Sequence, residues 1–121
     1  MERETAHCEG GLTLNICLSY GSRGEIVKAC QQMATEVKHG ILEVNQIDDL
    51  AMSSRLLTTH CPDPDVVIRT SGEYRLSNFL LWQLAYAELF FLQKTWPELE
   101  KGDLIEVIRD YAEGRSRRFG K

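Results

Sequence analysis

The sequence predicts an α/β fold in which a mainly parallel sheet is flanked by helices. Two short runs, 65–69 and 88–91, and a longer run, 12–20, are apolar and rich in residues that favour strands. Segments with apolar residues at helical spacing separate or follow these runs. Of the 121 residues, 43% are hydrophobic and 26% are charged, which is typical of one folded domain.

The first half of the chain carries a strand pattern followed by helix patterns. Residues 12–20 form the expected first strand, and we expect it to be buried on both faces. Ser22 and Glu25 match a capping box, so a helix is expected to start there and to end at Gly40. A second set of capping residues predicts another, shorter helix within 45–57.

The second half of the chain alternates between strand, loop and helix patterns. The segments are an expected strand at 65–69, a polar loop at 70–75, a short helix or irregular apolar stretch at 76–87, a last strand at 88–91, a helix at 104–112 and a basic tail at 115–121. Three strands are few for a parallel sheet that is buried on both faces. We therefore expect residues 1–121 to be a single partial domain whose amino-terminal part is absent.

Charge and hydropathy argue against two classes of protein. Eighteen acidic and 14 basic residues give a formal charge of -4, opposite to the footprint of a nucleic-acid-binding domain. No run of 18 apolar residues suits a transmembrane helix. The four cysteines lack C-x-x-C spacing and are expected to be reduced, which favours a cytoplasmic location or one peripheral to a membrane on its cytosolic side. Because the net charge is negative, any bound anion must be held by a local site.

Polar residues that suit an anion gather after the second expected strand. In open α/β sheets ligands bind beyond the carboxyl ends of the strands, and Arg69 stands at such an end. Gly72 permits a tight bend, and Arg75 and Ser77 follow it. Two guanidinium groups, a hydroxyl and backbone N–H groups match a phosphate or diphosphate. Glu88 interrupts an apolar run, and a carboxylate beside a bound diphosphate typically holds Mg²⁺.

Residue types alone leave a structural alternative open for each of these groups. Arg69 and Glu73 could pair as a salt bridge within the loop. Glu88 could pair structurally with Arg75. The basic residues 115–121 could be a solvated helix end, since cations are favourable at a helix carboxyl terminus.

The run from Arg69 to Glu88, RTSGEYRLSNFLLWQLAYAE, resembles the signature of the cis-prenyltransferases, the family of undecaprenyl diphosphate and dehydrodolichyl diphosphate synthases. Three more segments, 14–23, 96–97 and 117–120, resemble further family blocks in the same order. The resemblance covers about residues 11–120, and a signature of this length is far more specific than a lone glycine motif.

The resemblance implies a reaction and a set of site residues. Members of the family condense isopentenyl diphosphate with an allylic diphosphate to make a cis-polyprenyl diphosphate, with Mg²⁺ assisting diphosphate departure. By resemblance, the residues that bind isopentenyl diphosphate are Arg69, Arg75, Leu76 and Ser77, and Glu88 is a metal ligand. The expected fold is accordingly the C-terminal part of a cis-prenyltransferase domain.

The resemblance also has consequences for the carboxyl-terminal tail and for position 74. Arg118 and Gly120 fit a family motif that reaches across a dimer interface, which implies a homodimer or a heterodimer. Tyr74 stands where bacterial members often carry a metal-associated histidine, so Glu88 is the one metal ligand that is carried over. Long prenyl products are lipids, and peripheral membrane association is compatible with this reaction.

The family's amino-terminal half, with its Asp-Gly-Asn loop and catalytic aspartate, has no counterpart in the 121 residues. We therefore expect this chain to carry the isopentenyl diphosphate half-site and to be inactive alone. The alternative is a non-catalytic fragment or subunit that dimerises within a cis-prenyltransferase complex.

Overall fold

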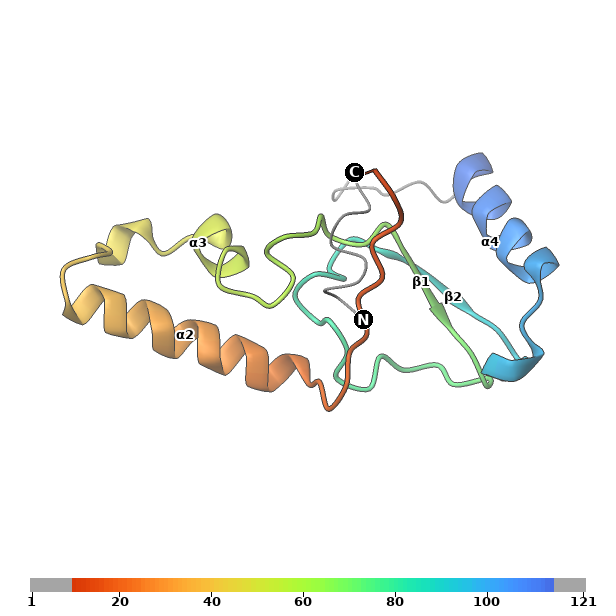
Figure 1. Cartoon of the computed structure of the whole chain (residues 1–121), viewed down its shortest axis with the longest axis horizontal. Coiled ribbons are helices and arrows are strands. Elements are labelled where there is room, and N and C mark those ends of the chain that lie inside the picture. The colour runs from red at the N-terminus through yellow and green to blue at the C-terminus, as the bar shows by residue number, and fades with distance from the viewer. Residues whose placement is uncertain (1–9, 115–121) are drawn as a thin grey trace.

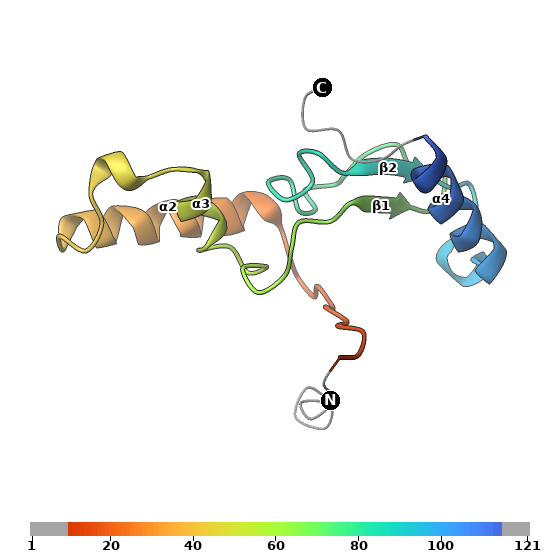
Figure 2. The ribbon, with the colours of Figure 1, turned by 90° about the horizontal axis from the view of Figure 1, so that it is seen from above.

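The computed structural model describes residues 10–114 (Figure 1). In chain order, its elements are helix α2 (Ser22–Lys38), the 3-10 helix η1 (Val44–Gln46), helix α3 (Asp49–Ser53), strand β1 (Val66–Arg69), strand β2 (Glu88–Phe91), the 3-10 helix η2 (Trp96–Glu98) and helix α4 (Lys101–Glu113). The molecule is elongated, with α2 and α3 on one side and the strands with α4 on the other (Figures 1 and 2).

Strands β1 and β2 form a parallel pair. Val66 lies beside Glu88 at one end of the pair, and Arg69 lies beside Phe91 at the other. The ladder continues beyond β2, where the Leu92 N–H donates to the Arg69 carbonyl over 2.8 Å. This pair confirms the α/β class and two of the three predicted strands.

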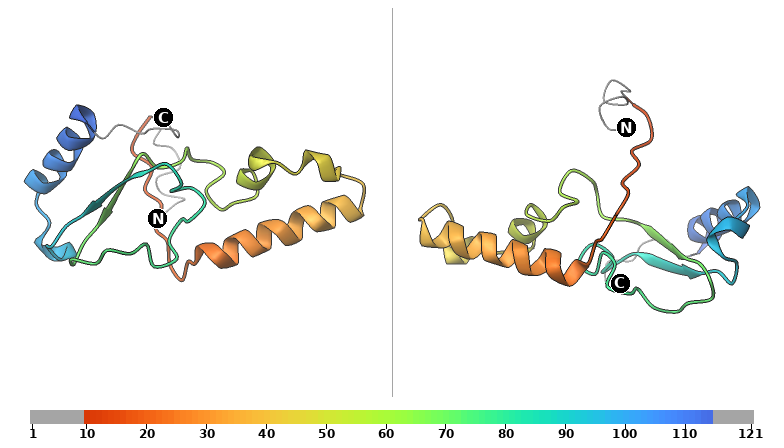
Figure 3. Two further views of the ribbon diagram at one scale, coloured as in Figure 1. Left: turned by 180° about the vertical axis from the view of Figure 1, so that it is seen from behind. Right: turned by 60° about the horizontal axis from the view of Figure 1, so that its bottom comes forward.

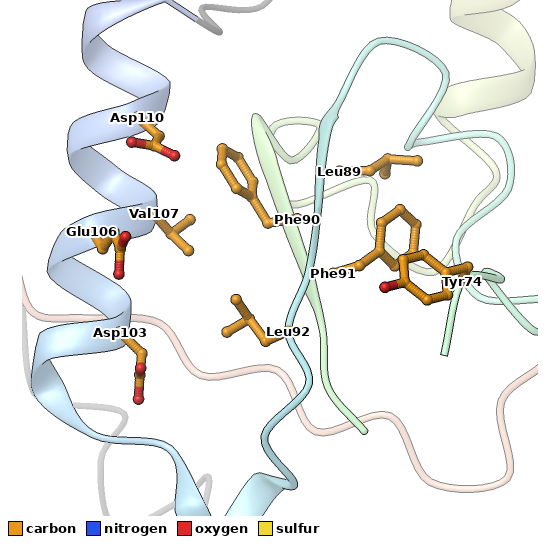
Figure 4. Close-up of a pocket in the computed structure, with 9 residues that line it drawn as sticks. All are labelled: Tyr74, Leu89, Phe90, Phe91, Leu92, Asp103, Glu106, Val107 and Asp110. Atoms are coloured by element: carbon orange, nitrogen blue, oxygen red, sulfur yellow. The ribbon is translucent and has the colours of Figure 1, made fainter. Parts of the chain in front are cut away.

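Helix α4 covers one face of the strand pair (Figures 1 and 4). Val107 is buried and points from α4 toward the buried Phe90 and toward Leu92. Leu89 and Phe91 point to the opposite face, so the side chains of β2 alternate as in an ordinary strand. The predicted helix at 104–112 is thereby confirmed. No helix within residues 10–114 is both long and apolar enough to cross a membrane.

Helix α2 confirms the helix that was predicted between Ser22 and Gly40, but the predicted capping box is wrong. Gly21 is the N-cap residue, and it provides no side-chain hydrogen bond. Ser22 and Glu25 are instead turned inward, with 0% and 6% of their surface exposed. Both side chains bond to distant segments, and such tertiary partners compete with a local cap for the same oxygen atoms. The chain turns after the helix at Gly40, as predicted, with φ +69°.

The strand predicted for residues 12–20 is wrong. The segment is irregular, joins neither β1 nor β2, and runs away from the helices and strands (Figure 3). Its apolar side chains are exposed, from 62% at Ile16 to 97% at Leu12. Asn15 holds it through Nδ2, which donates to Cys61 Sγ over 3.2 Å. A strand needs a neighbouring backbone to complete its hydrogen bonds, and residues 10–114 supply none at this place.

Two other segments have the structure that the sequence predicts. The short helix expected within 45–57 is α3, and the Asp48 side chain caps it by accepting from the Ala51 N–H over 2.7 Å. The apolar stretch at 76–87 is irregular rather than helical, with positive φ at three residues, Ser77, Asn78 and Leu80. The irregular alternative for this stretch is therefore correct.

Candidate functional site

The loop after β1 folds back over the end of β2. The Ser71 N–H donates to the Lys94 carbonyl over 2.8 Å, and the Gly72 N–H donates to the Leu92 carbonyl over 2.9 Å. Gly72 has φ +65°, and a Cβ at this position would lie 2.7 Å from Gln93 Oε1. Glycine is therefore required at position 72 by both backbone conformation and space.

Tyr74 fixes the same loop to β2. Its hydroxyl accepts a hydrogen bond from Gln93 Nε2 over 2.7 Å. Its ring packs on Phe91 with 5.2 Å between ring centres, and Figure 4 shows the two rings side by side. Tyr74 thus has a structural role where bacterial members of the resembled family often carry histidine.

Arg69 ends β1 at the base of this loop and is half-buried. Its Nε is buried and has no hydrogen-bond partner within residues 10–114. Leaving a buried donor unpaired costs roughly 1–3 kcal/mol, and more when the group is charged. An anionic oxygen that accepts from this donor would remove that cost.

Arg75 forms an ion pair with Glu73, two residues earlier in the loop. The side chains are 64% and 37% exposed, so the pair contributes at most about 1 kcal/mol. The alternative that Arg69 pairs with Glu73 is therefore wrong, because Glu73 pairs with Arg75. A pair this weak allows Arg75 to turn toward an incoming dianion.

Leu76 and Ser77 continue this loop toward the first turn of α2. The Leu76 carbonyl accepts from the Phe79 N–H over 3.0 Å, which closes a tight turn. Ser77 is exposed and has φ +50°. Arg69, Arg75, Leu76 and Ser77 thus follow one another along the connection that leaves the carboxyl end of β1 and runs toward the start of α2 (Figure 1).

Glu88 lies away from Arg69 within the described chain. It opens β2 beside Val66, three residues along the pair from Arg69, which corresponds to roughly 10 Å of strand. Strand alternation places Glu88 on the face of Phe90 and Arg69 on the face of Phe91. The sequence already indicated this separation, because Arg69 ends one predicted strand whereas Glu88 begins the next.

The predicted metal site is not assembled within residues 10–114. Residues 10–114 hold no group of three or more histidine, cysteine or acidic side chains that could bind a metal. Arg75 pairs with Glu73, so the structural alternative of a Glu88–Arg75 pair is wrong too. The metal role of Glu88 with Mg²⁺ stays a prediction.

The groove between β2 and α4 is unsuited to an anion. It has a volume of about 410 Å³ and is lined by apolar residues of β2 and, on the α4 side, by Asp103, Glu106 and Asp110 (Figure 4). Lys94 donates to both carboxylate oxygens of Asp103 over 2.8 and 2.9 Å, which lowers the pKa of Asp103. Negative charge on this wall repels a diphosphate, so the loop at 69–77 is the better candidate.

A buried polar cluster joins the first turn of α2 to the segment after Ser77. Glu25 accepts from the Leu57 N–H over 2.7 Å, from Gln83 Nε2 over 3.3 Å and from the Tyr20 hydroxyl. Burial and the hydrogen bond to Glu25 raise the pKa of Tyr20 to about 12. Sequence reasoning missed this cluster, because its members are far apart along the chain. The predicted contacts of Arg118 and Gly120 lie outside the described residues.

Known proteins are similar to almost the whole chain. The family model described as "Putative undecaprenyl diphosphate synthase" matches residues 1–120. An isoprenyl transferase of Lactobacillus johnsonii is 50% identical over 121 residues, covering 98% of this chain and 50% of that protein. The ditrans,polycis-undecaprenyl-diphosphate synthase ((2E,6E)-farnesyl-diphosphate specific) of Xanthomonas axonopodis pv. citri is 49% identical, covering 98% of this chain and 46% of that protein. The chain spans about half the length of the curated relatives it matches.

Two solved structures are similar in fold. Lavandulyl diphosphate synthase from Lavandula x intermedia, crystallised with dimethylallyl diphosphate, aligns with a TM-score of 0.80 and 40% identity, covering 86% of this chain and 44% of that one. A probable undecaprenyl diphosphate synthase from Campylobacter jejuni aligns with a TM-score of 0.78 and 35% identity, covering 99% and 52%. Both similarities support the α/β fold.

Proposed function

Because the chain belongs to the undecaprenyl diphosphate synthase family, we propose that it takes part in prenyl transfer and that residues 69–77 bind the diphosphate of isopentenyl diphosphate. Similar proteins are isoprenyl transferases, and a similar structure holds dimethylallyl diphosphate. In the proposed reaction, isopentenyl diphosphate and an allylic diphosphate give a longer cis-polyprenyl diphosphate. A carbon–carbon bond forms as the allylic carbon–oxygen bond breaks, diphosphate leaves and the isopentenyl unit loses a proton.

The buried Nε of Arg69, without a hydrogen-bond partner within residues 10–114, is the observation that carries this proposal. A guanidinium can donate two parallel hydrogen bonds to phosphate oxygens, and one of its donors is already desolvated here. Arg75 supplies a second positive charge from the same loop, held only by the exposed pair with Glu73. Together, these two charges match a diphosphate better than a single cation does.

The two other residues of the proposed site, Leu76 and Ser77, complete the contacts to the anion. The exposed Ser77 hydroxyl donates to a phosphate oxygen, and Leu76 lies beside the same anion. The backbone bonds at Ser71 and Gly72 keep the loop folded against β2 while the ligand enters. Binding therefore uses a fixed arginine at the strand end and a second arginine that moves.

The 121 residues by themselves are proposed to bind this diphosphate without forming product. The resemblance assigns ionisation of the allylic substrate to an aspartate outside the matched blocks. A polyprenyl product formed by the purified 121 residues from both substrates would contradict this part of the proposal.

Calorimetric titration with isopentenyl diphosphate tests the proposed site. Arg69→Ala and Arg75→Ala are expected to weaken binding at least about tenfold, since each removes a charge-assisted hydrogen bond. Arg69→Lys keeps the charge but removes the planar fork, and we expect it to bind weakly as well. Arg109→Ala is the matched control, because Arg109 is exposed on α4 away from the loop. Equal affinities for all four variants would contradict the proposal.

A second candidate function is a non-catalytic subunit that pairs with a complete synthase. The observation that favours it is the exposed apolar row of Leu12, Leu14, Ile16 and Leu18, which residues 10–114 leave uncovered. Sedimentation of the purified chain mixed with a complete synthase tests this candidate, since the absence of a complex at micromolar concentration would count against it. Retained binding of isopentenyl diphosphate would favour the first candidate, because a supporting subunit has no need of that site.

A further inference from the structure

The first turn of α2 is capped by a residue from a distant segment. The first N–H groups of a helix have no partner within the helix, and Gly21 has no side chain to supply one. The Ser22 N–H donates instead to the Asn78 carbonyl over 2.8 Å. The Arg23 N–H donates to Asn78 Oδ1 over 2.9 Å. One residue, 55 positions away from Arg23, therefore satisfies two of the free helix donors.

The contact is reciprocal. The Ser22 hydroxyl oxygen, fully buried, accepts from the Leu81 N–H over 2.9 Å. Tyr20 and Phe79 pack edge to face with 5.8 Å between ring centres. Figure 1 shows the connection between β1 and β2 passing beside the start of α2. The start of α2 and the segment around Asn78 therefore stabilise each other's conformation.

The loop needs this support because its backbone is unfavourable on its own. Ser77, Asn78 and Leu80 have φ of 50°, 62° and 45°, in the left-handed region that residues with a Cβ seldom adopt. Asparagine tolerates this conformation better than most residues, but serine and leucine do not. Such strain persists only where surrounding contacts impose it, and it occurs often at ligand sites.

We propose that Asn78 is a positioning residue, which holds Ser77 and Arg75 in the diphosphate-binding conformation by capping α2 from the loop. The inference rests on the proposed function, since it concerns the same diphosphate site. Gly21 belongs to the device, because a Cβ there would lie 2.9 Å from Asn78 Nδ2. Gly21→Ala therefore displaces the Asn78 amide without changing the loop sequence.

Titration of isopentenyl diphosphate into the purified chain tests the proposal. Asn78→Ala removes the acceptor of the Arg23 N–H and is expected to raise Kd about tenfold. Asn78→Asp keeps an oxygen acceptor at the helix N-terminus and is expected to restore most of the affinity. Asn45→Ala, at an exposed position in η1, is the control with unchanged Kd. An Asn78→Ala chain that binds as tightly as the parent would overturn the proposal.

Hydrogen exchange supplies a readout that a merely structural role would not move. Exchange at the Ser22, Arg23 and Leu81 N–H groups is expected to slow when the parent chain binds isopentenyl diphosphate, because loop and helix end are coupled. Exchange that a saturating ligand leaves unchanged would overturn the proposal, even if Asn78→Ala fails to fold.

The variant Arg69→Ala, titrated in parallel, separates two kinds of failure. If Arg69→Ala loses binding while Asn78→Ala and Gly21→Ala bind normally, the positioning role is wrong and the proposed function stands. If Arg69→Ala binds normally, or if the parent does not bind, the proposed function is wrong and the positioning role with it.

Discussion

Replacing Gly72 by alanine perturbs the proposed site through its backbone. Gly72 has φ +65°, and the new Cβ would lie 2.7 Å from Gln93 Oε1. The Gln93 side chain must then move, and its hydrogen bond to the Tyr74 hydroxyl is lost. Gly40 is a matched comparison, because it has a similar φ of +69° but no atom within 4 Å of the position that a Cβ would take.

Comparing alanine substitutions at the two glycines separates the cost of a positive φ from the cost of the steric contact with Gln93. Left-handed backbone costs a residue with a Cβ roughly 1–2 kcal/mol, and the loss of unfolded-chain freedom returns roughly 0.4–1 kcal/mol. Gly40→Ala is therefore expected to lower the free energy of unfolding by about 1 kcal/mol. Gly72→Ala also loses the Gln93 hydrogen bond, worth about 1 kcal/mol, which gives about 2 kcal/mol in all.

Urea denaturation followed by fluorescence measures both losses, and titration with isopentenyl diphosphate measures the effect on binding. Gly72→Ala is expected to weaken binding as well as stability, whereas Gly40→Ala is expected to change stability alone. Equal stability losses in the two variants, or unchanged binding by Gly72→Ala, would refute the reasoning.

Three further predictions follow from the structure. Of the four tyrosines, Tyr20 is expected to ionise near pH 12 in an absorbance titration, and the step should vanish in Tyr20→Phe; its contribution to stability is present below pH 10.0 and is lost as the pH rises toward 12. Lys94 lowers the pKa of Asp103, so the stability that Asp103 contributes is present above its ordinary pKa of 3.8 and is lost as the pH falls through the lowered value. In a plot of melting temperature against pH, Asp103→Asn is expected to reduce the fall at acid pH. Binding of isopentenyl diphosphate alone is expected to survive EDTA, because the proposal assigns it to Arg69 and Arg75, and a tenfold or larger loss in calorimetry would contradict that assignment.

The parts of the fold that depend on local pattern could be predicted from the sequence. The strands at 66–69 and 88–91 follow from short apolar runs, and α2 and α4 follow from helical spacing. The sequence also places Arg69 at the end of a strand and Arg75 in the loop after it, at the sheet edge where ligands bind, and their binding role stays a prediction. These features need only residues that are close together in the sequence.

The parts that depend on distant partners could not be predicted in this way. Residues 12–20 have strand-forming side chains, but a strand also needs a neighbour, which a single segment does not specify. Ser22 matches a capping residue, yet its hydroxyl accepts from Leu81 in another segment. The capping of α2 by Asn78 likewise depends on how the two segments pack. Glu88 differs, since its place at the start of a strand was available from the sequence.

The most direct test of the proposed diphosphate site is an NMR titration that follows the side-chain Nε–H signal of Arg69, assigned by its absence in Arg69→Lys. This donor is buried and has no hydrogen-bond partner within residues 10–114. On addition of isopentenyl diphosphate, we predict a downfield shift of that signal and slower exchange of its proton, as a phosphate oxygen accepts the hydrogen bond. A saturating titration that leaves the Arg69 signal unchanged would contradict the account.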